Sequence, residues 1–174
     1  MSETKTATLA DTNTQAKAWT QSLVLITIIS FLPFFIHLQW LTGPLVNAAL
    51  IVTLFLFGRK AAIVAALIPS LMALLGGLLP IALLPLLPFI MVSNIILILV
   101  IEYLVKNQSY GLAAISGAAA KFIFLAISAQ IVWLFLQKSA LLKVVATLFG
   151  VTQLYSALLG GLIALVVLKW LKRI

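Results

Sequence analysis

The stretch FIMVSNIILILVIEYLV, residues 89–105, decides the fold class, because it contains a single charged side chain, Glu102. A helix needs about 20 predominantly apolar residues to cross the hydrocarbon core of a bilayer. Ser93 and Asn94 lie close together near its start. The stretch therefore predicts a membrane-spanning helix that carries a small polar patch.

The rest of the chain repeats this pattern. Of its 174 residues, 64% are hydrophobic and 8% are charged, whereas soluble domains have roughly one half and one quarter. Further apolar stretches predict helices at 19–38, 44–57, 61–79, 112–136 and 147–168, and three prolines between 80 and 88 exclude a regular helix there. We predict an all-α polytopic membrane protein, a bundle of about six transmembrane helices at 19–174, preceded by a polar, disordered cytoplasmic tail at 1–18.

The basic residues predict the orientation of these helices. With the N-terminus in the cytoplasm, most Lys and Arg side chains flank the inner helix ends, and only Lys138 and Lys143 flank the outer ends. This bias is the one that the positive-inside rule describes. We therefore predict cytoplasmic N and C termini, a multi-pass location in the cell (plasma or inner) membrane, and contact with membrane lipid. Because the net charge of +8 follows the helix ends, we predict no nucleic-acid partner.

The composition also excludes most catalytic chemistry. The chain has three acidic residues, one histidine and no cysteine. Paired carboxylates for acid–base catalysis and a zinc site of His and Cys ligands are therefore not expected within the membrane. No glycine-rich phosphate loop is present either. We predict no enzymatic activity, no metal and no cofactor, so that any ATP-driven step needs another subunit.

Uncharged polar side chains gather in the predicted outer half of the bundle. Gln130 and Trp133 share a face of one helix because they are three residues apart. A few polar groups among apolar and aromatic side chains are typical of ligand pockets. We predict that these side chains bind a largely neutral small-molecule substrate, with Lys138 and Lys143 able to attract an anionic one; the pocket residues are His37, Gln39, Asn47, Asn94, Gln130, Trp133 and Gln153. The alternative is that the amides bond one another and hold the helices together.

Two charged residues lie within predicted helices. We interpret Lys121 as a side chain that snorkels to the nearby interface, with a functional role as the alternative. Glu102 is four residues from Lys106, which favours an ion pair along the helix over a role in proton coupling.

Three segments carry a resemblance to a known family: TGPLVNAALI (42–51), FGRKAAIVAALIPSLMALLGG (57–77) and PFIMVSN (88–94). Their layout resembles that of the S components of energy-coupling factor (ECF) transporters, the substrate-binding membrane subunits of bacterial micronutrient importers. The resemblance implies six helices with an outward-opening pocket, uptake of a vitamin-like micronutrient, and docking on an ECF transmembrane subunit with two ATPases. Docking would then use small residues such as Ala114 and Ala118. A non-transport membrane assembly protein and a stand-alone secondary transporter remain the alternatives.

Overall fold

The computed structural model describes residues 39–77, 81–135 and 149–174, together with isolated positions at 20, 21, 24, 27, 28, 31, 145 and 146. Within this part the elements are helical: α2 (Gln39–Leu75), the 3-10 helix η1 (Ile81–Leu86), α3 (Leu87–Leu104), α4 (Tyr110–Phe135) and α6 (Val151–Trp170). Four helices are long and apolar enough to cross a membrane. The all-α membrane character is confirmed. Most of the helix expected at 19–38 lies outside the described residues, so the number of six spans stays a prediction.

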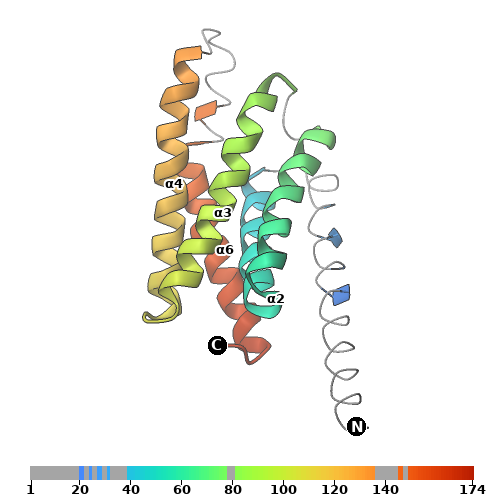
Figure 1. Ribbon diagram of the computed structural model, residues 1–174, viewed down its shortest axis with the longest axis vertical. Helices are drawn as coiled ribbons and strands as arrows, with labels where there is room; N and C mark the ends of the chain where they lie inside the picture. The colour runs from blue at the N-terminus through green and yellow to red at the C-terminus, as the bar shows by residue number, and fades with distance from the viewer. Residues whose placement is uncertain are drawn as a thin grey trace, which may run out of the picture.

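Helix α2 consists of two helices joined at Gly58, whose backbone has φ 81° and ψ 179°. Residues other than glycine rarely adopt this conformation. The two arms lie side by side in opposite directions (Figure 1), and side chains from both, such as Leu50 and Ala62, belong to one apolar cluster. The turn expected at residues 58–60 is therefore confirmed.

The prediction for the start of α2 is wrong, whereas the prediction for the proline-rich connector is confirmed. Helix α2 begins at Gln39, so the start expected for the helix at 44–57 is wrong, and Pro44 lies inside the helix. Proline is tolerated in membrane helices because neighbouring groups satisfy the backbone that it frees. In the connector, Pro85 lies in η1 and α3 then begins with a proline in its first turn, so no regular α-helix runs through it, as expected.

Glycines set how closely the helices approach. A Cβ atom on Gly160 of α6 would lie 2.6 Å from Cβ of Asn47 and 2.8 Å from the carbonyl oxygen of Pro44, both in α2. Similarly, a Cβ atom on Gly117 of α4 would lie 2.8 Å from Cγ1 of Ile101 in α3. Small residues let membrane helices pack backbone to backbone, and these two contacts join α2 to α6 and α3 to α4.

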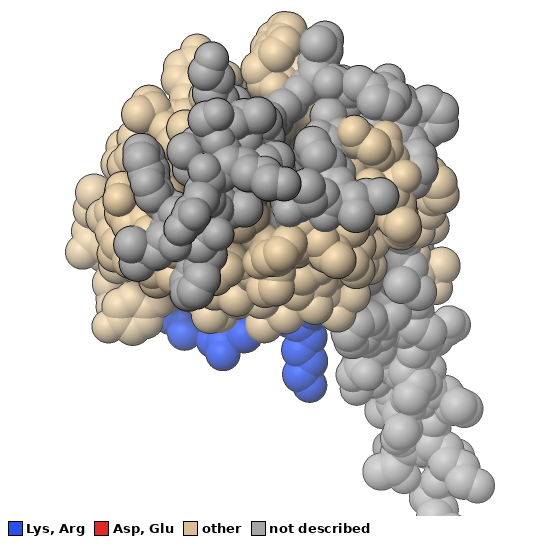
Figure 2. Space-filling view, turned by 90° about the horizontal axis from the view of Figure 1, so that it is seen from above, with Lys and Arg blue, Asp and Glu red and all other residues tan. Residues whose placement is uncertain are grey.

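The basic side chains of the described residues gather at one end of the bundle. This end carries the turn at Gly58, the turn between α3 and α4, and the C-terminus (Figure 1). We call it the basic end; its residues are Arg59, Lys60, Lys106, Lys169, Lys172 and Arg173. Figure 2 looks onto the opposite end, where blue side chains appear only at the edge of the tan surface. The bundle is thus asymmetric in charge along its long axis.

Candidate functional site

One charged side chain is buried among the described residues, and it is Lys121 of α4, at 2% exposure. Its Nζ donates hydrogen bonds of 2.7 Å to Oδ1 of Asn47 in α2 and of 2.7 Å to Oδ1 of Asn94 in α3. Asn47 Nδ2 donates to Oγ of Ser156 in α6 at 3.0 Å, and Asn94 Nδ2 donates to the carbonyl oxygen of Ala66 at 3.3 Å. We call Lys121, Asn47, Asn94 and Ser156 the central cluster; it joins α2, α3, α4 and α6.

The chemistry of the ammonium group fixes the orientation of both carboxamides. An ammonium has three N–H donors and no acceptor. Each asparagine must therefore turn its oxygen towards Lys121 and its NH₂ group away. In Asn47 this NH₂ group meets the Ser156 hydroxyl, and in Asn94 it meets the second arm of α2. The two short bonds from the ammonium have the length typical of charge-assisted hydrogen bonds.

The central cluster lies near the middle of the bundle. Lys121 is eleven residues into α4 from Tyr110, which is roughly 16 Å at about 1.5 Å per residue. Asn94 is ten residues before the end of α3 at Leu104, or roughly 15 Å. The hydrocarbon core of a bilayer is about 30 Å thick. Asn47 and Asn94 thus lie near the middle of their helices, slightly on the side away from the basic end, and we call this position mid-depth.

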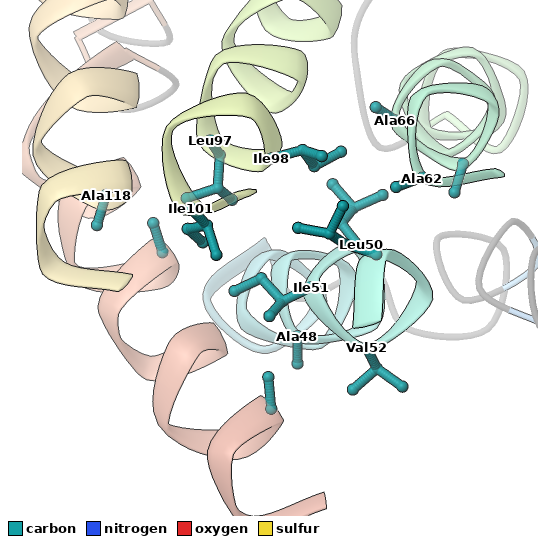
Figure 3. Packing of buried hydrophobic residues seen from close by; sticks show 14 of the residues in the cluster. Ala48, Leu50, Ile51, Val52, Ala62, Ala66, Leu97, Ile98, Ile101 and Ala118 are labelled. Carbon is teal, nitrogen blue, oxygen red and sulfur yellow. The ribbon is translucent and has the colours of Figure 1, made fainter. Parts of the chain in front are cut away.

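Between the central cluster and the basic end, the interior is apolar. The next buried residues along each helix are aliphatic side chains and small residues, and each is fully or almost fully buried. Figure 3 shows them meeting between the helices; they include Leu50, Ile51, Ala62, Leu97, Ile98, Ile101 and Ala118. This layer separates the ammonium group from the basic end.

Towards the opposite end, the same helix faces carry two buried serines as well as large apolar side chains such as Leu125. Ser70 lies four residues beyond Ala66, and Ser128 lies seven residues beyond Lys121, so each continues the face of its partner. Both serines are buried, and Ser128 donates to the carbonyl oxygen of Phe124 at 2.8 Å. On α6, Gln153 is half-buried one turn beyond Ser156. A second apolar cluster at this end comes mainly from α3, α4 and the residues before α6.

No acidic side chain of the described residues pairs with Lys121. Glu102 is the acidic residue in this part of the chain, and Glu3 and Asp11 belong to the first 18 residues. Glu102 accepts a 2.6 Å hydrogen bond from Nε of Arg59 at the basic end. It lies eight residues from Asn94 along α3, roughly 12 Å by helix rise. The central cluster therefore combines one cation with neutral partners.

Two interpretations from the sequence are corrected by these contacts. Lys121 does not snorkel, because its ammonium group is buried and bonded at mid-depth. The expected pair of Glu102 with Lys106 is replaced by the ion pair with Arg59. The reason is the fold of α2, since the turn at Gly58 brings Arg59 to the end of α3, a contact that helical spacing within α3 does not reveal.

The predicted pocket residues fall into three groups. Asn47 and Asn94 come together at Lys121, whereas Gln153 is half-buried one turn away on α6. Gln130 is exposed on α4 and does not join the central cluster. The third group lies outside what the structure describes: His37 altogether, and the side chains of Gln39 and Trp133.

The residues predicted for docking lie inside the bundle. Ala118 is 0% exposed and Ala114 is 9% exposed. A Cβ atom on Gly161 would contact the Cβ of Ala114 at 3.3 Å. Their small side chains thus serve packing within this chain, which is the role that small residues commonly have between membrane helices.

The predicted pocket did not include the two remaining members of the central cluster, Lys121 and Ser156, although a functional role for Lys121 was the alternative to snorkelling. A signal for Lys121 was present, because it shares a helix face with Gly117 and Ser128, a face of small residues. Gln130, on the other side of α4, was instead taken to point inward. The described residues contain no group of three or more His, Cys, Asp and Glu side chains that could hold a metal ion.

Neither a protein-family model, nor a curated protein, nor a solved structure matches this chain.

Proposed function

We propose that this chain is the substrate-binding membrane subunit of an uptake system for a vitamin-like micronutrient, located in the cell membrane and energised by a separate ATPase module. The observation that carries the proposal is Lys121, held at mid-depth by Asn47 and Asn94 from two other helices. An ionisable residue inside a membrane bundle is a candidate for function by default. The alternative role of these contacts is to hold the helices together.

The energetics favour binding over stabilisation. Placing a lysine at the centre of a membrane helix costs about 2.5–3.5 kcal/mol on insertion scales. Hydrogen bonds between membrane helices return only about 0.6 kcal/mol on average. Lys121 makes two such bonds, so it does not recover its own cost. A ligand that bonds to the ammonium group would offset the remaining free-energy cost of this lysine.

The distribution of buried polar side chains supports uptake rather than export. The apolar layer lies between the central cluster and the basic end, whereas on the other side two buried serines accompany the second apolar cluster. By the positive-inside rule the basic end faces the cytoplasm. A solute would then reach the central cluster from outside, and inward release would require the apolar layer to open.

Energy for this opening has to come from a partner. The sequence contains no glycine-rich phosphate loop, and its layout resembles subunits that dock on an ECF transmembrane subunit with ATPases. We therefore propose such a module as the partner. Because Ala114 and Ala118 are buried, the docking surface would use other residues.

A stand-alone secondary transporter is a second candidate, and one observation favours it. Such a protein needs a coupling group within the membrane, and Lys121 is a buried ionisable residue at mid-depth. Glu102 is less suited, because it pairs with Arg59 at the basic end. Uptake by the purified chain alone in liposomes, driven by an ion gradient, would select this candidate over the ATPase-dependent one.

Native mass spectrometry of the gently purified chain tests the proposal. We expect one small molecule bound per chain in the wild type, lost in Lys121→Met and kept in Lys106→Met. Lys106 is exposed in the turn between α3 and α4, so it controls for the loss of a lysine. A wild-type chain that carries lipid alone would contradict the proposal and favour a membrane assembly protein.

A further inference from the structure

The hydrogen atoms left over in the central cluster indicate the kind of ligand that it takes. The ammonium of Lys121 uses two of its three N–H groups within the cluster. Each carboxamide has two N–H groups and uses one. The Ser156 hydroxyl accepts from Asn47 and keeps its own hydrogen to donate. Among the described contacts, each of the four side chains thus retains one donor.

The acceptors of the cluster are engaged in the opposite way. The oxygens of Asn47 and Asn94 both point at the ammonium group, and Ser156 Oγ accepts from Asn47. A ligand that offered N–H groups would compete with Lys121 for these oxygens and would meet its positive charge. A ligand that offers oxygen acceptors instead meets N–H and O–H donors that have no partner within the cluster.

The charge balance leads to the same class of ligand. The chain has three acidic residues; two precede residue 12, and Glu102 is paired with Arg59. The apolar layer lies between the central cluster and the basic end. In a low-dielectric interior a lone cation is stabilised strongly by an opposite charge at contact distance.

We infer that the central cluster binds the carboxylate or another oxyanion group of a small solute, with Lys121 as the charge partner and Asn47, Asn94 and Ser156 as positioning hydrogen-bond donors. The inference rests on the proposed function and narrows its substrate from a largely neutral molecule to an acid. Lysine is a common partner of oxyanions as a compact point charge. On ligand arrival the third N–H group of the ammonium donates to the anionic oxygen.

Asn47→Asp tests this charge logic while both contacts of Asn47 within the cluster are kept. The carboxylate has nearly the shape of the carboxamide, accepts from Lys121 in the same way, and accepts from the Ser156 hydroxyl once that hydroxyl turns. The variant therefore supplies the missing counter-ion from within the chain. We expect it to stay folded and to lose an anionic ligand, with occupancy at least tenfold below that of the wild type.

The experiment compares the full chain in three forms: wild type, Asn47→Asp and Asn107→Asp. Asn107 is exposed in the turn after α3, so its variant adds the same charge away from the central cluster. Each form is purified from membranes in lipid nanodiscs, its melting temperature is measured, and small molecules extracted from it are identified by mass spectrometry in both polarities. If Asn47→Asp does not fold, Asn94→Asp adds the charge from the other side of the ammonium group, at the loss of the hydrogen bond that Asn94 Nδ2 donates to the carbonyl oxygen of Ala66.

The outcomes separate the inference from the proposed function. An organic or inorganic acid that is bound to wild type and Asn107→Asp, and absent from a folded Asn47→Asp or Asn94→Asp, supports the inference. A neutral or cationic molecule in the wild type leaves the binding subunit standing and overturns the anion site. An acid that remains bound to the folded Asn47→Asp form also overturns it. A wild type without any bound small molecule contradicts the proposed function itself.

Discussion

The central cluster and the apolar layer beside it are built on the same helices, yet they solve the packing problem with different chemistry. In the apolar layer, Leu97 and Ile101 of α3 close over Gly117 of α4. In the central cluster, Gly160 of α6 brings α2 equally close, but the side chain brought in is Asn47. Glycine thus sets the helix spacing in both regions, and polarity distinguishes them.

This difference separates stability from function. The apolar layer is made of residues that a membrane bundle needs for packing. The central cluster holds a lysine that membrane insertion disfavours. Substitutions that change helix spacing should therefore damage the fold, whereas substitutions that change only the charge of the central cluster should affect binding.

Gly160→Leu should have the largest effect on stability. Even the first added atom would lie 2.6 Å from Asn47 Cβ and 2.8 Å from the Pro44 carbonyl oxygen, so α2 and α6 must separate. Overpacking of this kind costs typically about 1–3 kcal/mol, occasionally more. A large fall in the melting temperature of the detergent-solubilised chain is expected. Gly111→Ala is the matched control, because a Cβ atom there meets nothing within 4 Å; equal melting temperatures for the two variants would contradict the close contact.

Gly58→Ala should be the next most damaging change. The φ of 81° and ψ of 179° at this residue lie in a region that side chains disfavour, at a cost of about 1–3 kcal/mol. Space is not the reason, since a Cβ atom on Gly58 would meet nothing within 4 Å. The melting temperature should fall by more than in Gly111→Ala. An unchanged melting temperature would show that the two arms of α2 do not depend on this conformation.

Lys121→Met should lower the stability of the fold by only about 1 kcal/mol, the difference between the midpoints of two opposing costs. Removing the buried cation removes an insertion cost of about 2.5–3.5 kcal/mol. The two asparagine oxygens then lose their donor, and each unsatisfied oxygen lowers the stability by about 1–3 kcal/mol. Thermal unfolding with ligand-free protein provides the measurement. A loss of stability as large as that of Gly160→Leu would show that the central cluster holds the fold together. It would contradict the separation of function in the central cluster from stability in the apolar layer.

Glu102→Gln should have the smallest effect. The ion pair with Arg59 is at the basic end, where the side chains are 55% and 23% exposed, and exposed ion pairs contribute little to stability. We expect a melting temperature within experimental error of the wild type, and the same ligand occupancy. Loss of the ligand in this variant would instead assign Glu102 a role in coupling.

Much of the fold follows from the sequence, because apolar stretches, prolines and basic turns are local signals. Gly58 and the residues after it predicted the turn in α2, and the prolines before α3 predicted an irregular connector; both appear in the structure. The start of α2 was missed because proline favours the first turn of a helix, whereas Pro44 lies inside a helix that begins at Gln39.

Less of the candidate site follows from the sequence. Asn47 and Asn94 were identified from polarity alone, but their common partner was not, since it depends on which face of α4 points inward. Lys121 and Gln130 lie on opposite faces of that helix, and both faces carry polar residues. Only the packing of α4 against α3 and α6 decides between them. The same limit applies to Arg59 and Glu102, which are 43 residues apart in sequence.

The structure of the chain with its co-purified small molecule, determined in lipid nanodiscs, tests the central claim most directly. The account predicts that the molecule lies at mid-depth, with an oxygen within hydrogen-bond distance of Lys121 Nζ and with Asn47 or Asn94 among its contacts. A molecule bound elsewhere, with Lys121 still joined to both asparagines, would contradict the account and leave the central cluster as a polar contact between helices.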